Sequence, residues 1–337
     1  MTPCRPTIPA LCLHQKELNH AELGDLLEEL KRLGSQYDIL RRKHLGRLAK
    51  YTGRNVIIYY SAWLQKPDLH RQRNSALLLT DADKNGFMTA VHKMDRSKGL
   101  DLLLHTPGGE MAATESLIEY LRAMFGTDIR AIVPQLAMSA GTLVALACKQ
   151  IIMGKQSSLG PIDPQIGGIP AHGVLEEFER AHAEVAAVPH FAHIWQPIIA
   201  KYTPAFVGEC EKASRWADEM ARQWMQTGMF EGDPDAGDKI NTVMTELGEH
   251  PTTYSHARHF SAEKAKGLGL NIYELEKDNK LQDLVLSVHH ATILTLEQTP
   301  TLKIIENNKG HAFVSRIQAT IVPVMPPGVR PMGADES

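Results

Sequence analysis

The sequence has few cysteines and no long apolar run. Its four cysteines, Cys4, Cys12, Cys148 and Cys210, are far apart, and none forms the Cys-x-x-Cys pair that favours a metal or redox site. This usage fits a reducing cytoplasm rather than a disulfide-linked scaffold. No window approaches the roughly 18 to 20 apolar residues of a membrane span. We therefore expect a cytoplasmic protein with no membrane span.

Charge and composition exclude further classes of protein. A net charge of −3 gives no reason to expect nucleic acid or an anionic membrane as a partner. The apolar content of 43% and the charged content of 22% are typical of a globular protein. A chain of 337 residues is long enough for one large domain with insertions or for two domains. The first 13 residues contain three prolines and no sustained apolar core, so they do not predict a signal peptide.

The central part of the chain alternates short apolar runs with helical periods. An apolar run over Leu102–His105 ends at Thr106-Pro107-Gly108-Gly109, which we call the glycine turn, and a helical period covers Met111–Phe125. A second run, Ile129–Val133, leads to Ala137-Met138-Ser139-Ala140-Gly141-Thr142, the serine turn, and then to an apolar helix. This alternation predicts an α/β fold in which helices cover a parallel sheet. Both turns then lie beyond the carboxyl ends of strands, where such sheets hold their sites.

The two turns together have the groups that acyl transfer needs. Gly108 and Gly109 lack a Cβ, so the backbone can direct its amides towards a bound oxygen, as an oxyanion hole requires. Ser139 begins a helix, where unpaired N–H groups favour a developing negative charge. The small Ala140 lets a substrate carbonyl come close. The alternative is that the serine only caps a helix and the glycines only make a turn; their order along the chain favours the functional interpretation.

These motifs carry a resemblance to a known family. The two turns and the later run Ser157-Ser158-Leu159-Gly160-Pro161-Ile162-Asp163-Pro164-Gln165 resemble the superfamily of Clp proteases, signal peptide peptidase SppA and crotonases. Within it, residues 55–273 most resemble the serine dehydrogenase proteinase family of SppA-like and ClpP-like serine peptidases. The helix that begins at Ser261 and ends at Gly269 is similar to the one that closes the core in Clp-type and SppA-type proteins.

The resemblance implies a fold and a site. The fold is a Clp protease and crotonase-like core of repeated β-β-α units. The nucleophile is Ser139, and the oxyanion hole consists of the amides of Gly109 and Ala140, with Gly108 as a further member. Relatives enclose their sites by assembling into rings or stacked trimers. We therefore expect a homo-oligomer.

The base that activates the serine stays open. A serine hydroxyl is a poor nucleophile until a neighbouring group takes its proton; Clp-type enzymes use a histidine with an acid, and SppA-type enzymes use a lysine. Asp163 stands in the place of the Clp histidine, and His256 and His259 fill the place of the Clp acid. One hypothesis is a swapped pair, in which the histidine and the acid have exchanged places along the chain. His256, or else His259, then takes the proton, and Asp163 orients that histidine. Another is a desolvated Lys212 or Lys201. The histidines can also be ordinary polar residues at a helix start.

No metal or cofactor is expected. The histidine pairs His289-His290 and His190/His193 have no third ligand close in sequence, whereas zinc needs three or four. The chain has no Gly-x-Gly-x-x-Gly after a strand, so the word dehydrogenase in the family name does not predict NAD binding.

The expected function is hydrolysis of a peptide or an unfolded protein through an acyl-enzyme on Ser139. A non-catalytic scaffold or peptide-binding module is one alternative. A crotonase-like acyl-CoA enzyme is another, but no basic cluster near the glycine turn would bind the CoA phosphates. Whether an ATP-driven unfoldase assists stays open.

Five regions are expected along the chain. The leucine pattern from Glu17 to Lys50 predicts an amphipathic helix or two, which can pack on its own domain or on a second subunit. The regions are a helical arm (1–52), the core with both turns (53–168), a helical insertion (169–250), the last core elements (251–278), and a C-terminal helix, hairpin and flexible tail (279–337).

Overall fold

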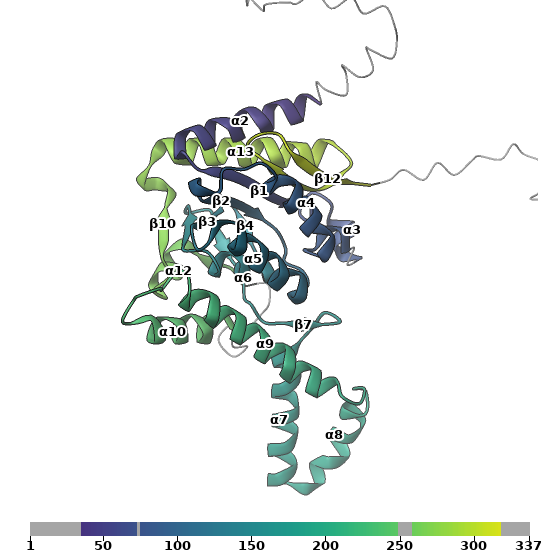
Figure 1. Cartoon of the computed structure of the whole chain (residues 1–337). Coiled ribbons are helices and arrows are strands. Elements are labelled where there is room, and N and C mark those ends of the chain that lie inside the picture. Colours follow the sequence, from purple (N-terminus) through teal and green to yellow (C-terminus); the bar gives the residue numbers. More distant parts are fainter. Residues whose placement is uncertain (1–34, 73–74, 249–257, 318–337) are drawn as a thin grey trace, which may run out of the picture.

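The computed structural model describes residues 35–72, 75–248 and 258–317. At its centre is a seven-stranded sheet (Figure 1), in the order β10 (Ile272–Glu274), β5 (Gln150–Met153), β3 (Ile129–Val133), β2 (Leu100–His105), β1 (Asn55–Ser61), β11 (Thr301–Asn307) and β12 (Ala312–Arg316). The strands from β10 to β1 run parallel. Strand β11 is antiparallel to β1, and β12 is antiparallel to β11. The predicted α/β fold is confirmed.

Helices cover both faces of the sheet (Figure 1). On one side lie α2 (Gln36–Thr52) and α13 (Asn279–Gln298), and on the other lie α4 (Asp81–Val91), α5 (Met111–Phe125) and α6 (Ala140–Leu146). Neighbouring strand residues alternate between two apolar clusters: Leu102 packs on the α5 side and Leu103 on the α13 side. Because both faces are covered, β1 and β2 are buried at every residue.

The arm that precedes the core packs on its own chain. Helix α2 begins at the cap residue Ser35, whose hydroxyl accepts a hydrogen bond from the N–H of Asp38, and ends at Gly53 in a left-handed conformation. Leu45 and Leu48 are fully buried in the cluster beneath α13. Of the two partners left open for the leucine pattern, the described part therefore contacts its own domain. Residues 17–34 of that pattern lie outside the described residues.

A buried ion pair fastens this arm to the sheet. Arg41 of α2 and Glu306 of β11 are both fully buried and joined by a hydrogen-bonded salt bridge. Arg41 also donates to the Thr295 hydroxyl of α13 at 3.0 Å, and Arg42 donates to the second carboxylate oxygen of Glu306 at 2.6 Å. One network thus joins α2 to two elements that follow it by more than 200 residues.

The C-terminal hairpin differs from the expectation in one respect. The turn at Asn307–Gly310 joins two antiparallel strands, as predicted. The sequence assigned this hairpin to a region separate from the core, but β11 pairs with β1 and so extends the central sheet. The physical reason is that Ile304 and Ile305 point to opposite faces and are both fully buried, which a solvent-exposed hairpin would not permit.

The insertion is helical, as predicted. It contains α7 (Ala171–Ala187), the short η3 (Pro189–Phe191), α8 (Ala192–Ile199), α9 (Phe206–Gln226) and α10 (Ala236–Gly248). The breaks between these helices fall at Pro189, Pro204 and Pro234. Trp224 and Ile240 join the core cluster that contains α6, so α9 and α10 belong to the body of the protein. Helices α7 and α8 project from that body (Figure 1).

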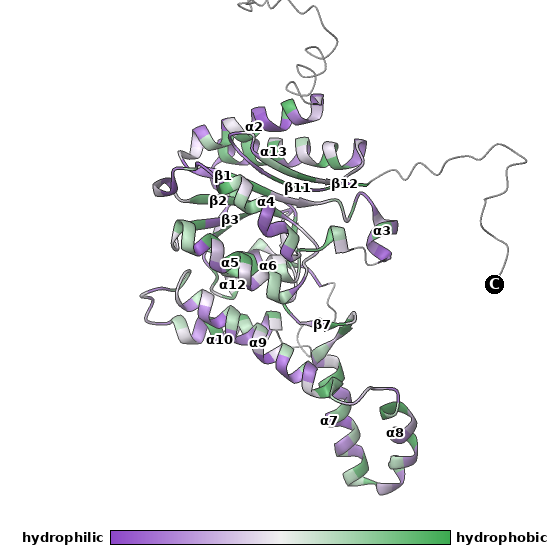
Figure 2. Ribbon diagram, turned by 45° about the vertical axis from the view of Figure 1, so that its right-hand side comes forward, coloured by the Kyte–Doolittle hydropathy of each residue, from purple (hydrophilic) through white to green (hydrophobic). Residues whose placement is uncertain are grey.

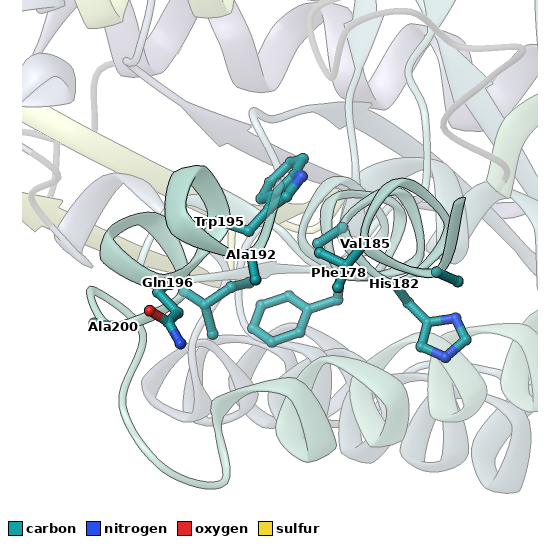
Figure 3. A pocket seen from close by; sticks show the side chains of 10 residues that line it. Phe178, His182, Val185, Ala192, Trp195, Gln196 and Ala200 are labelled. Carbon is teal, nitrogen blue, oxygen red and sulfur yellow. The ribbon is translucent and has the colours of Figure 1, made fainter. Parts of the chain in front are cut away.

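The projecting pair encloses an apolar groove, which we call the α7–α8 groove. Its volume is about 640 Å³, and it is lined mainly by apolar side chains, including Phe178, Val185, Ala192, Trp195, Ile199 and Ala200 (Figure 3). Helix α8 is coloured largely as hydrophobic in Figure 2, although it lies away from the core. Near the tip, Val188 and Ile194 are 45% and 56% exposed. The groove is therefore an apolar surface that the described residues leave open to solvent.

The remaining elements are short. A three-stranded sheet has the order β4 (Leu136–Ala137), β6 (Ser158–Leu159) and β9 (Phe260–Ser261). Strands β7 (Gln165–Ile166) and β8 (Ile169–Pro170) pair with each other. Helix α12 (Ala262–Gly267) is capped by Ser261, as predicted, and Gly269 follows it with φ +91°. The other short helices are α3 (Pro67–Arg71), η1 (Ser75–Leu77), η2 (Arg96–Lys98) and η4 (Leu275–Lys277).

Candidate active site

The glycine turn and the serine turn lie side by side. Thr106, which follows β2, pairs in parallel with Ala137 of β4. The N–H of Thr106 donates to the carbonyl of Leu136 at 3.2 Å, and the N–H of Met138 donates to the carbonyl of Thr106 at 3.0 Å. The predicted meeting of the two turns at the carboxyl edge of the sheet is therefore what the structure has.

Gly108 lies in close contact with the serine turn. Its φ is +108°, which side chains rarely permit, and a Cβ built there would lie 2.7 Å from the Cβ of Ser139 and 3.0 Å from the nitrogen of Ala140. Its N–H donates to the Thr106 hydroxyl at 3.2 Å. The amide of Gly108 therefore already has an acceptor within its own turn. Gly108 allows the close approach.

Ser139 has an unusual backbone conformation. Its φ of 51° and ψ of −116° are rare for a residue with a side chain, and such strain concentrates at functional sites. The serine precedes α6 at the cap position, yet its hydroxyl accepts no capping hydrogen bond from this helix. The alternative of a mere helix cap therefore loses its support. The side chain is only partly buried, so a substrate can reach it.

Two amides beside Ser139 can receive an oxyanion. The carbonyl of Gly108 and the N–H of Glu110 both bond to Leu79, at 2.9 Å each. In such a parallel bridge the groups of the residue between them, Gly109, point away from Leu79. Ala140 is the first residue of α6, so its N–H has no carbonyl partner within the helix. These two N–H groups come from the two turns that meet.

Thr142 ties the serine turn to the strand that leads to Asp163. Its hydroxyl lies 2.8 Å from the carbonyl of Ala137 and accepts from the N–H of Gly160 at 3.0 Å. A Cβ at Gly160 would lie 3.2 Å from the Cα of Met138, so the segment after β6 passes directly beside the serine turn. We did not single out Thr142 from the sequence, where a hydroxyl inside an apolar helix gives no signal of this role.

Asp163 is buried three residues beyond Gly160, with 2% of its surface exposed. Burial raises the pKa of the nearby Cys210 thiol, and the negative charges of Glu209 and Asp163 add to this effect. The structure thus places an acidic group in the protein interior, on the segment that adjoins the serine turn.

His256 lies outside the described residues, but the chain on either side of it does not. Before it, the carbonyl of Leu247 accepts from the N–H of Ile162 at 2.9 Å. After it, Phe260 of β9 pairs with Leu159 of β6. The described chain therefore leaves and returns next to the segment that ends at Asp163. His259, the other candidate, is exposed.

The two lysine candidates are both exposed, Lys212 on α9 and Lys201 before it. A lysine becomes a base near neutral pH only when it loses its water. Neither candidate has that environment here.

His105, the histidine closest in sequence to the glycine turn, does not serve this site. Its side chain packs on the α13 side of the sheet against Tyr60, Trp63 and His289. Burial lowers the pKa of His105 to about 3. It is therefore a neutral core residue at pH 7.

Comparison with known proteins supports the predicted family. Residues 74–195 match the family model described as "ClpP-like SDH-type serine proteinase". The predicted resemblance to the serine dehydrogenase proteinases is confirmed. The match includes both turns and Asp163 and ends before Lys212 and His256.

Two relatives come from Methanocaldococcus jannaschii, and both are named as uncharacterized. The protein MJ0137 is 37% identical over 125 residues, which are 35% of this chain and 43% of the relative. The protein MJ1495 is 29% identical over 214 residues, which are 61% of this chain and 68% of the relative. The alignment thus spans less than half the length of the first relative.

Among solved structures, a mutant of the 1510-N membrane-bound stomatin-specific protease is similar with a TM-score of 0.36 and 15% identity, over 61% of this chain and 79% of that one. Within the described ranges, no helix is long and apolar enough to cross a membrane. In the same ranges, no three His, Cys, Asp or Glu side chains gather as a metal site.

Proposed function

We propose that this ClpP-like protein is a peptidase that hydrolyses peptide bonds through an acyl-enzyme on Ser139. The observation that carries the proposal is the strained, uncapped serine pressed against Gly108. A base takes the hydroxyl proton while the oxygen attacks the peptide carbonyl, and the amides of Gly109 and Ala140 bind the oxyanion. The intermediate expels the amine, which takes the proton from the base. Water then hydrolyses the ester in the same way.

For the base we propose His256, oriented by Asp163. The support is that the chain leaves β6 through Asp163 and that the described residues on both sides of 249–257 contact this segment. A buried carboxylate can fix the tautomer of a histidine and stabilise the imidazolium that forms. The exposure of Lys212 makes the lysine alternative weaker.

The first test is the reaction of Ser139 with a fluorophosphonate probe. We expect a single adduct, located at Ser139 by mass spectrometry, and none in Ser139→Ala. Because the hydroxyl caps no helix, the substitution should change the free energy of unfolding by less than about 1 kcal/mol. Equal labelling of Ser139→Ala would exclude the nucleophile. An unlabelled wild-type protein would favour the non-catalytic scaffold.

The acyl-CoA alternative gains no support. A cavity of about 440 Å³ does contain Lys50, Lys98 and Lys309. It also contains Arg54 and Asn55, where β1 begins, and therefore lies at the opposite edge of the sheet from Ser139. Cations at that edge cannot bind the phosphates of a CoA whose thioester is at the serine.

We further propose a homo-oligomer, located in the cytoplasm, in which the α7–α8 groove contacts a second copy. An apolar surface such as Val188, Ile194 and the groove is costly to leave in water and commonly marks an interface. The free, buried thiols of Cys148 and Cys210 fit a reducing compartment.

Light scattering measures the assembly directly. We expect a mass of at least two chains for the wild-type protein and a smaller mass for Ile194→Glu, because a charge in a buried apolar contact is unfavourable. A monomer mass at every concentration would contradict the proposal.

A further inference from the structure

The glycine turn is held from its outer side by the chain at Leu77-Leu78-Leu79-Thr80, which we call the clamp segment. Leu79 bonds to the carbonyl of Gly108 and to the N–H of Glu110. A Cβ at Gly109 would lie 2.2 Å from the carbonyl oxygen of Leu79 and 2.4 Å from its nitrogen. The backbone of Leu79 therefore rests directly on Gly109, whose N–H faces the other way.

Buried polar groups fix the clamp segment on both sides of Leu79. The Ser61 hydroxyl of β1 donates to the carbonyl of Leu77 at 2.7 Å. The ammonium of Lys303 on β11 donates to the carbonyl of Leu78 at 2.6 Å. The carboxylate of Asp83 on α4 accepts from the N–H of Thr80 at 3.0 Å. Each neighbour of Leu79 in the segment is thus held by a different element.

Lys303 and Asp83 form an ion pair inside the protein. Their side chains are 3% and 2% exposed, and the ammonium lies 2.8 Å from both carboxylate oxygens. The Tyr59 hydroxyl also donates to Asp83 at 3.0 Å. Burial lowers the pKa of Lys303, while the charge of Asp83 acts in the opposite direction. A buried pair of this kind adds little net stability over apolar residues of similar size, so stability alone does not account for it.

We propose that Lys303 and Asp83 are positioning residues that hold the Gly109 N–H in place for the oxyanion of the reaction on Ser139. They act through the clamp segment, in which Lys303 bonds to Leu78 and Asp83 bonds to Thr80. Leu79, between these two residues, then fixes the position of the glycine turn relative to the serine turn. The inference rests on the proposed peptidase function for its catalytic part, but the positioning itself is a property of the fold.

The test uses the full chain and the double variant Lys303→Met with Asp83→Asn. Asparagine keeps the acceptor for Thr80, and methionine fills the space of lysine without a charge. The matched control is Arg41→Met with Glu306→Gln, because this second buried pair lies on the opposite face and does not touch the glycine turn. Both variants are labelled with the fluorophosphonate probe under conditions where circular dichroism shows them folded.

We expect the limiting labelling rate of the clamp variant to fall about a hundredfold, since a shift of about 1 Å in a catalytic group has that effect. The probe concentration for half-maximal rate should stay within about twofold. The reason is that the oxyanion donor acts in the transition state and not in the non-covalent binding of the probe. The control should label at the wild-type rate.

Amide hydrogen exchange of the peptide spanning residues 104–112 tests the positioning without catalysis. The N–H of Glu110 should exchange at least about tenfold faster in the clamp variant, because its hydrogen bond to Leu79 weakens. In the control variant its exchange rate should equal that of the wild-type protein. If the wild-type serine does not label, the peptidase function fails and exchange alone decides the positioning.

If the double variant does not fold, Ser61→Ala removes only the bond to Leu77 and should show the same two effects at smaller size. Wild-type labelling and wild-type exchange in a folded clamp variant would overturn the inference.

Discussion

Replacing His256 by alanine is expected to reduce casein hydrolysis by about 10⁵- to 10⁶-fold, as removal of the histidine does in other serine peptidases. The reason is that the hydroxyl of Ser139 cannot lose its proton without a base. His259→Ala and Lys212→Ala are the matched controls, since both side chains are exposed in the structure. Both controls should retain activity within about threefold, because substitutions at exposed positions change stability by only about 0.5 kcal/mol.

The pH dependence separates the two kinds of base. A histidine near its reference pKa of about 6.5 loses its proton as the pH rises through that value, so the rate should rise there and then level. A lysine near about 10.4 would give a rate that rises only in alkali. If only Lys212→Ala loses activity and the rate of the wild-type protein rises only in alkali, the lysine and not His256 is the base. Full activity of all three alanine variants would exclude both the histidine and the lysine as the base.

Replacing Gly108 by alanine is expected to lower hydrolysis at least about a hundredfold and the free energy of unfolding by about 2 to 4 kcal/mol. The backbone at φ +108° does not accept a Cβ, and that Cβ would meet the Cβ of Ser139 at 2.7 Å. The two turns must therefore separate, which moves the Gly109 amide away from the serine.

Gly46→Ala is the control for this effect. Gly46 lies inside α2, and a Cβ there would meet nothing within 4 Å. Alanine at this helical position should raise the free energy of unfolding by about 0.5 to 1 kcal/mol and leave hydrolysis unchanged. Chemical denaturation and the casein assay measure both quantities. Wild-type activity in Gly108→Ala would show that the close contact between the turns is not needed.

Much of the core could be predicted because its signals are local. Helix α5 has the predicted bounds, Met111–Phe125, since its apolar residues recur at helical spacing and Gly126 follows them. Strand β3 also has the predicted bounds, Ile129–Val133, as a short run between turn residues. The meeting of the two turns followed from the rule that sites lie at the carboxyl edge of a parallel sheet.

Other features depend on contacts between distant residues, which no local pattern reveals. The pattern Leu302–Glu306 predicts a strand, but not that this strand pairs with β1. Asp83 lies in the first turn of α4, and its carboxylate also binds Lys303, 220 residues later in the chain. The different roles of Gly108 and Gly109 likewise depend on what packs against each of them.

The sequence by itself determined the α/β class, the two turns, the serine and the helical nature of the insertion, because each is set by the spacing and backbone freedom of a few neighbouring residues. Only the tertiary structure decided that Gly108 gives close approach while the groups of Gly109 point away from Leu79, that α2 packs on its own domain, and that Lys303 and Asp83 bond to the clamp segment. These features arise when the folded chain brings separate strands and helices within hydrogen-bond and van der Waals distance, and that proximity is not written in any one segment.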